Sequence, residues 1–193
     1  MSPRTKEQFQ EIREQSRVKI LMAALEVFAE KGYHSSSIGE IAKKAGVAKG
    51  SVYHYFESKE AVLQEVIVNG VTELEGIMKL VQSKASPKEQ LETLVSLSFD
   101  SVRDRKDFWQ LYFSLLTQLN LPKSLEQIMG PMITDMFTFI THLMEALGVE
   151  NAAIEAKMLG ATMDGAFLHY LMLGEEYPLK DVETSIIKKY INT

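Results

Sequence analysis

Apolar residues recur along this chain at spacings of three and four, and no stretch of useful length alternates apolar with polar residues. The segment from Phe9 to Glu30 shows the pattern, with Ile20, Ala24 and Phe28 each four residues apart. In a helix of about 3.6 residues per turn such positions line one buried face, whereas a half-buried strand requires a period of two. We therefore expect an all-α fold.

Glycine, proline and serine mark where the predicted helices begin and end. Ser37 and Glu40 have the spacing of a capping box at the start of a short helix, and Gly46 ends that helix. We expect Pro131 to kink or split the helix that contains it. After the first helix, the predicted helices lie near residues 37–45, 49–56, 59–83, 87–103, 105–119, 123–147, 150–173 and 180–191.

Two short helices joined by a glycine turn, after a longer helix, match the plan of a helix-turn-helix. In that plan the third helix enters the major groove of DNA, so its outward face needs small and polar side chains. The candidates are Lys49, Gly50, Ser51, His54 and Tyr55, with Tyr53 on or beside that face and Lys59 placed for a phosphate. Spacing alone leaves open a plain three-helix packing unit.

The residue types favour DNA binding over plain packing. From Phe28 to Ala61 the chain reads FAEKGYHSSSIGEIAKKAGVAKGSVYHYFESKEA. This pattern, within residues 20–66, resembles the N-terminal part of the TetR/AcrR family of bacterial regulators. Two positions depart from it: Ala48 stands where the family often has a serine or threonine cap, and Gly39 lies early in the second helix, which it weakens.

The resemblance implies a role for each matching residue. Ser36 or Ser37 would contact a phosphate at the start of the second helix. The residues implied to face bases are Lys49, Gly50, Ser51 and His54, and those implied to contact the DNA backbone are Tyr55 and Lys59. Arg17 and Lys19 are further phosphate candidates, although a solvated helix face explains them equally well.

Charge is divided unevenly along the chain. The formal net charge is -5, but residues 1–60 contain 10 Lys/Arg and 8 Asp/Glu, whereas residues 61–193 contain 11 and 18. Phosphate contacts are local, so an acidic body with a mildly basic N-terminal module can still bind DNA. We predict a helix-turn-helix domain at 1–58 and a ligand-binding and dimerisation domain at 59–193.

The second predicted domain is rich in aromatic and methionine side chains, and the resemblance implies that it holds an effector pocket and a homodimer interface. Methionine adapts to irregular cavities, which favours an apolar or aromatic ligand. The predicted lining is Phe99, Arg103, Trp109, Tyr112, Phe113, Met132, Met136, Phe137, Met163 and Phe167. For each apolar residue, plain core is the alternative, and Arg103 is either a carboxylate anchor or a solvated charge. We place the dimer interface on the last two helices.

Several function classes find no support in the sequence. The chain has no cysteine, which excludes disulfides and zinc–thiolate sites. No nucleophile–base arrangement, phosphate loop or metal motif is readable, so we predict no enzyme, cofactor or metal site. No secretory signal or membrane span is expected, which suits a cytoplasmic protein. The predicted function is a ligand-responsive repressor, released from a double-stranded, pseudo-palindromic operator by a small, largely apolar effector. A helical binding protein without DNA affinity is the rival.

Overall fold

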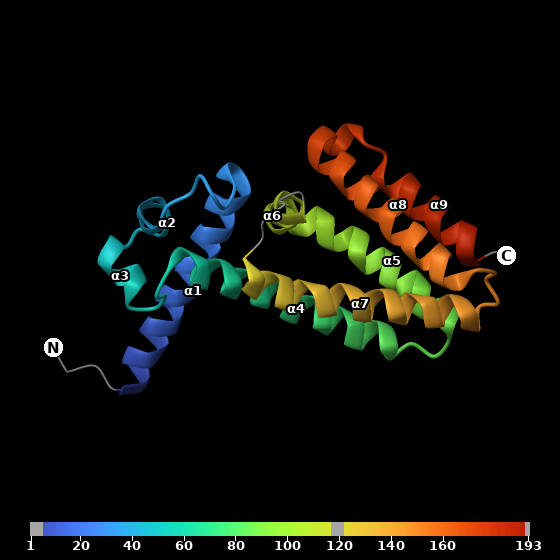
Figure 1. The fold of residues 1–193 in the computed structure, drawn as a ribbon, viewed down its shortest axis with the longest axis horizontal. Coiled ribbons are helices and arrows are strands. Elements are labelled where there is room, and N and C mark those ends of the chain that lie inside the picture. Colours follow the sequence, from blue (N-terminus) through green and yellow to red (C-terminus); the bar gives the residue numbers. More distant parts are fainter. Residues whose placement is uncertain (1–5, 117–121, 192–193) are drawn as a thin grey trace. The chain divides into compact units, whose positions relative to one another are not determined.

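The computed structural model describes residues 6–116 and 122–191, and within these ranges the chain is helical with no strand (Figure 1). The predicted all-α fold is confirmed. The elements are α1 (Lys6–Lys31), α2 (Ile38–Ala45), α3 (Lys49–Tyr53), α4 (Lys59–Gln82), α5 (Pro87–Asp104), α6 (Lys106–Leu116), α7 (Lys123–Ala146), α8 (Ala152–Leu173), the 3-10 turn η1 (Gly174–Glu176) and α9 (Leu179–Ile191). The helix end predicted near residue 119 lies outside the described residues.

The chain divides into two compact units. The first comprises Met1–Gly70 and Gln110–Pro122, and the second comprises Val71–Trp109 and Lys123–Thr193. Helices α4 and α6 contribute to both units. The first unit therefore extends beyond the domain boundary predicted at residues 58 and 59, because the first turns of α4 bury apolar residues such as Val62 and Leu63.

The first unit contains α1, α2 and α3. The predicted inner face of α1 is buried, with Ile20, Ala24 and Phe28 each 0% exposed. Helix α1 packs on α2, and α2 packs on α3, which contributes the buried Val52. This packing fixes the outer face of α3 relative to the start of α2.

Local sequence signals set the ends of α2 and α3. Ser37 and Glu40 form the predicted capping box, and Gly46 ends α2 with a left-handed φ of 69°. A side chain would be strained in that conformation, so glycine suits the turn. Ala48 makes no side-chain cap, and α3 ends at Tyr53, three residues earlier than predicted.

The second unit is a helical bundle in which α5 packs against α7 and α9, and α8 packs against α7 and α9. Helices α7 and α8 approach closely at Gly160, where an added Cβ would lie 2.8 Å from the Phe137 ring. Helix α7 continues through Pro131, so the expected split does not occur. Pro131 and Gln127 are exposed, and water can solvate the carbonyl that Pro131 leaves without a donor.

The described helices include none that is both long and apolar enough to cross a lipid bilayer.

Candidate nucleic-acid interface

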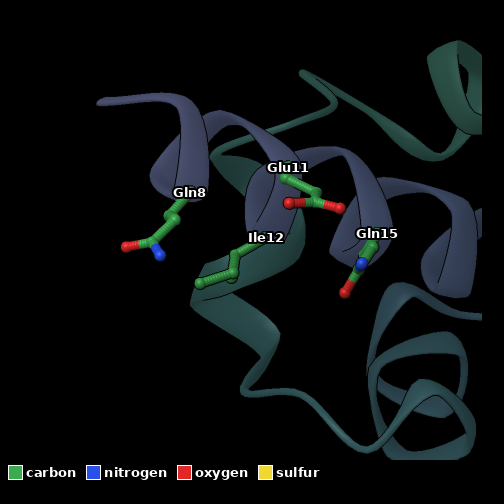
Figure 2. Close-up of a pocket in the computed structure, with 4 residues that line it drawn as sticks. All are labelled: Gln8, Glu11, Ile12 and Gln15. Carbon is green, nitrogen blue, oxygen red and sulfur yellow. The ribbon is translucent and has the colours of Figure 1, made fainter. Parts of the chain in front are cut away.

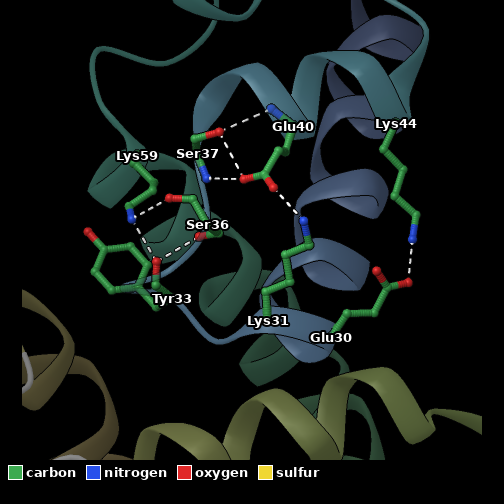
Figure 3. Close-up of polar contacts among 8 residues, drawn as sticks. All are labelled: Glu30, Lys31, Tyr33, Ser36, Ser37, Glu40, Lys44 and Lys59. Carbon is green, nitrogen blue, oxygen red and sulfur yellow. Dashed lines mark hydrogen bonds and ion pairs between the residues drawn. The ribbon is translucent and has the colours of Figure 1, made fainter.

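The start of α2 presents one serine to solvent and buries another. The Ser37 side chain is exposed; its hydroxyl accepts from the Glu40 amide and donates to the Glu40 carboxylate, at 3.3 and 2.9 Å. Ser36 is 6% exposed, and its hydroxyl donates to the carbonyl of Tyr33 at 2.6 Å. Of the two predicted phosphate contacts, Ser37 thus lies on the accessible surface, whereas Ser36 fixes the loop (Figure 3).

Two lysines tie α2 to α1 (Figure 3). Lys31 bonds to the Glu40 carboxylate, and this hydrogen bond, followed by that of Ser37, lowers the pKa of Glu40. Lys44 lies 2.8 Å from Glu26 and 2.6 Å from Glu30, and its hydrogen bonds to them raise the pKa of Lys44 to about 12. These contacts hold the short helix α2 in a fixed position against α1.

The outer face of α3 carries the candidate base-reading residues. Lys49, Gly50 and His54 are exposed, Tyr53 is 51% exposed, and Ser51 is half-buried. Within the described part of the chain, Lys49 has no acidic partner. This arrangement leaves one cation and several hydrogen-bonding groups accessible to a major groove, as the helix-turn-helix plan requires.

Gly50 offers a direct test of this face, because an added Cβ there meets no protein atom within 4 Å. We expect Gly50→Leu to preserve or raise thermal stability, since leucine favours helix over glycine by up to about 1 kcal/mol. We also expect it to lower operator affinity at least about tenfold, because the side chain would fill space next to base edges.

Thermal unfolding and fluorescence anisotropy with a duplex would measure both effects of Gly50→Leu. Gly76→Leu is the matched control, since Gly76 in α4 is equally open and lies outside α2 and α3. Equal operator affinity in all three proteins would remove Gly50 from the interface.

Lys59 has partners within the protein. Its ammonium donates to the carbonyls of Tyr33, Ser36 and His34 at 2.6, 2.8 and 3.3 Å, and lies 4.4 Å from the Tyr33 ring centroid. Burial lowers the pKa of Lys59. A lysine has three donors, so the carbonyls of the α1–α2 loop occupy all of them. A phosphate contact of Lys59 stays a prediction, and its evident role is to fix this loop (Figure 3).

Tyr55 and Arg17 lie near the end of α3. Tyr55 is half-buried, and its ring centroid is 6.4 Å from that of Phe56. Arg17 pairs with the carboxylates of Glu65 and Glu14 and lies over the Phe56 ring. Arg17 therefore connects α1 to α4, whereas Lys19 is exposed.

The predicted effector residues are distributed over both units. Phe99, Trp109 and Phe167 pack edge to face in the second unit, with ring centroids 4.9 and 5.1 Å from that of Phe167. These three are at most 9% exposed, as is Met163, so their place in an effector pocket stays a prediction. Half-buried positions in α7 are Met132, Met136 and Phe137, and in α6 they are Tyr112 and Phe113.

Arg103 belongs to an ion-pair cluster that connects α5 to α9. Its guanidinium pairs with Asp100 and lies 3.5 Å from Glu183, whose side chain is 2% exposed. Glu183 also accepts from Lys180 at 2.9 Å. The structure thus gives Arg103 two carboxylate partners within the chain, and a contact of Arg103 with a ligand carboxylate stays a prediction.

Sequence reasoning did not select the pocket lined by Gln8, Glu11, Ile12 and Gln15 (Figure 2). All four residues lie on α1 and are exposed, so this pocket is an open surface feature. In the part of the chain that the structure describes, no group of three or more His, Asp or Glu side chains could hold a metal ion.

These features define a helical regulator that binds DNA through an N-terminal helix-turn-helix. The family model for bacterial regulatory proteins of the tetR family matches residues 20–66, and that for the C-terminal part of BetI-type transcriptional repressors matches residues 87–193. The chain therefore belongs to the TetR family and is a ligand-responsive, DNA-binding transcriptional regulator.

Similar proteins are known at nearly full length. The fatty acid metabolism regulator protein of Bacillus subtilis is 26% identical over 187 residues, covering 91% of this chain and 93% of that protein. The repressor KstR2 of Rhodococcus jostii is 33% identical, but over only 45% of this chain and 43% of its own. The structure of FadR from B. subtilis with stearoyl-CoA has a TM-score of 0.75, with 26% identity over 90% of this chain and 97% of that chain.

Proposed function

We propose that this protein is a homodimeric repressor that binds a pseudo-palindromic operator and releases it when it binds a long-chain acyl-CoA. The observation that carries the proposal is an accessible α3 face in a chain similar over 91% of its length to a regulator of fatty acid metabolism. The FadR structure with stearoyl-CoA supports the effector class. Operator binding would take place in the cytoplasm.

The DNA contacts proposed are those accessible on the first unit. Ser37, Lys49, Gly50, Tyr53 and His54 are exposed. Ser51 and Tyr55 are half-buried beside them. The helix-turn-helix plan assigns Lys49 and His54 to base edges or phosphates and the start of α2 to a phosphate.

A dimer is supported by the surface of α8, which is apolar on two opposite faces. One face is buried within the chain by residues such as Leu159 and Met163. The other, here called the α8 stripe, repeats at alternating steps of four and three residues and consists of Ile154, Met158, Ala161, Gly165, Leu168 and Met172. Its large members are 43–72% exposed. Such spacing suits helix-to-helix packing, and a second copy would cover it.

The last helix, α9, on which the interface is also predicted, buries apolar residues within one chain. Ile186 and Tyr190 are each 7% exposed within one chain, and the Tyr190 hydroxyl donates to Glu155 of α8 at 2.9 Å. The contribution of α9 to a dimer would therefore come from its exposed side. Twofold symmetry would present two α3 helices to two half-sites, which explains the proposed palindrome.

Saturating stearoyl-CoA is expected to lower operator affinity at least about tenfold, because an effector acts through its different affinities for the two states. Anisotropy titrations of a duplex selected from a random pool would measure this. Coenzyme A without the acyl chain is the control. Equal affinity with and without stearoyl-CoA would contradict the effector class while leaving DNA binding intact.

A further inference from the structure

Helix α1 begins well before the matched DNA-binding family region, which starts at residue 20. Its N-terminal turns bring Arg13 beside Tyr55, the residue that follows α3 and its C-cap. The Arg13 guanidinium carbon lies 5.9 Å from the Tyr55 ring centroid. A cation outside the matched family region therefore stands next to a proposed DNA contact.

Within the part of the chain that the structure describes, no ion pair neutralises the charge of Arg13. Arg17, one turn further along α1, pairs with Glu14 and Glu65. Arg13 is exposed, and none of the described acidic residues forms an ion pair with it. On α1, the positions three and four residues from Arg13 include no carboxylate: they are Phe9, Gln10, Ser16 and Arg17.

The chemistry of this position suits an anion. A guanidinium presents a planar fork of donors that matches phosphate oxygens, and it can stack on an aromatic ring at the same time. Packing against Tyr55 limits the conformations of Arg13, so less entropy is lost when a phosphate binds.

We propose that Arg13 contacts a DNA phosphate at the edge of each half-site, which extends the interface from α2 and α3 to α1. This inference rests on the proposed operator contact of Tyr55. It adds one phosphate contact per protomer, two in a dimer. Since binding releases about 0.9 counterion per neutralised phosphate, Arg13 would contribute roughly 1.8 to the slope of log affinity against log salt.

The experiment uses full-length protein and the duplex that the wild-type protein selects from a random pool, titrated at several salt concentrations. Arg13→Gln is expected to lower affinity and reduce the salt slope by about 1.8, and Arg13→Lys to keep the slope. Lys88→Gln is the matched control, because Lys88 is exposed on α5, outside α1, α2 and α3, and its replacement removes the same charge. It should keep the wild-type slope.

Three results would overturn the inference. An unchanged slope with lower affinity for Arg13→Gln would mean that Arg13 only orients Tyr55. Equal losses in Arg13→Gln and Lys88→Gln would indicate a general effect of net charge. Salt-independent binding by the wild-type protein would contradict the proposed function itself. If wild-type binding depends on salt and Arg13→Gln has the same slope, only the role of Arg13 is contradicted.

Discussion

Replacing Leu168 with glutamate is expected to separate the dimer into monomers and to lower operator affinity by about a thousandfold. Leu168 belongs to the α8 stripe and is 43% exposed in one chain. The substitution therefore costs little in the monomer, where the carboxylate is solvated. In a dimer it would bury two unpaired charges across a helix interface, which costs several kcal/mol.

The loss of affinity follows from geometry. A dimer neutralises two sets of phosphates with one association step, and a monomer retains only one set. Sedimentation equilibrium would report the mass, and anisotropy the affinity for the selected duplex. The expected result is a halved mass, unchanged helical content and greatly weakened operator binding.

A control on the same helix distinguishes the stripe from a general effect of charge. Ala153 is exposed and lies about a quarter of a turn from the centre of the stripe, on the side away from Glu155. Ala153→Glu adds the same charge, and we expect it to remain a dimer with wild-type affinity. If Leu168→Glu also remains a dimer, the interface lies on another surface.

Features that depend on neighbours in sequence were predictable. The spacing of Ile20, Ala24 and Phe28 gave the buried face of α1, and Ser37 with Glu40 gave the start of α2. These signals act over three or four residues, within one helical turn, so the chain displays them directly. The end of α3 was predicted less accurately. The helix ends at Tyr53, whereas the residues up to Phe56 keep a helical apolar spacing in the sequence.

Features that depend on tertiary contacts were not predictable. Arg103 and Glu183 are 80 residues apart in sequence, and no local pattern links them. Periodicity also does not distinguish a pocket wall from core packing, because both place an aromatic ring on the inner face of a helix. Phe99 and Phe167 fit either description in the sequence, and their edge-to-face contact is visible only in the fold.

Lys59→Met is expected to weaken operator binding about tenfold or more without changing its salt dependence. The ammonium of Lys59 bonds three carbonyls of the loop that leads into α2, and these bonds connect residues 23 to 26 positions apart. A hydrogen bond to a charged group contributes about 1.5–3 kcal/mol, so the loop loses order when methionine replaces the lysine. Fewer conformations of the loop would then place Ser37 and the backbone amides of α2 in contact with a phosphate.

The salt slope separates this role from a direct phosphate contact. Lys49→Met is the matched variant, because Lys49 is exposed and has no acidic partner among the described residues. If Lys49 contacts a phosphate, its loss reduces the slope by about 1.8 per dimer and leaves thermal stability unchanged. Lys59→Met should do the reverse, with a wild-type slope and a lower unfolding temperature of the first unit. A reduced slope with normal stability in Lys59→Met would instead mean that the ammonium leaves the carbonyls and binds DNA, because only a neutralised phosphate releases counterions.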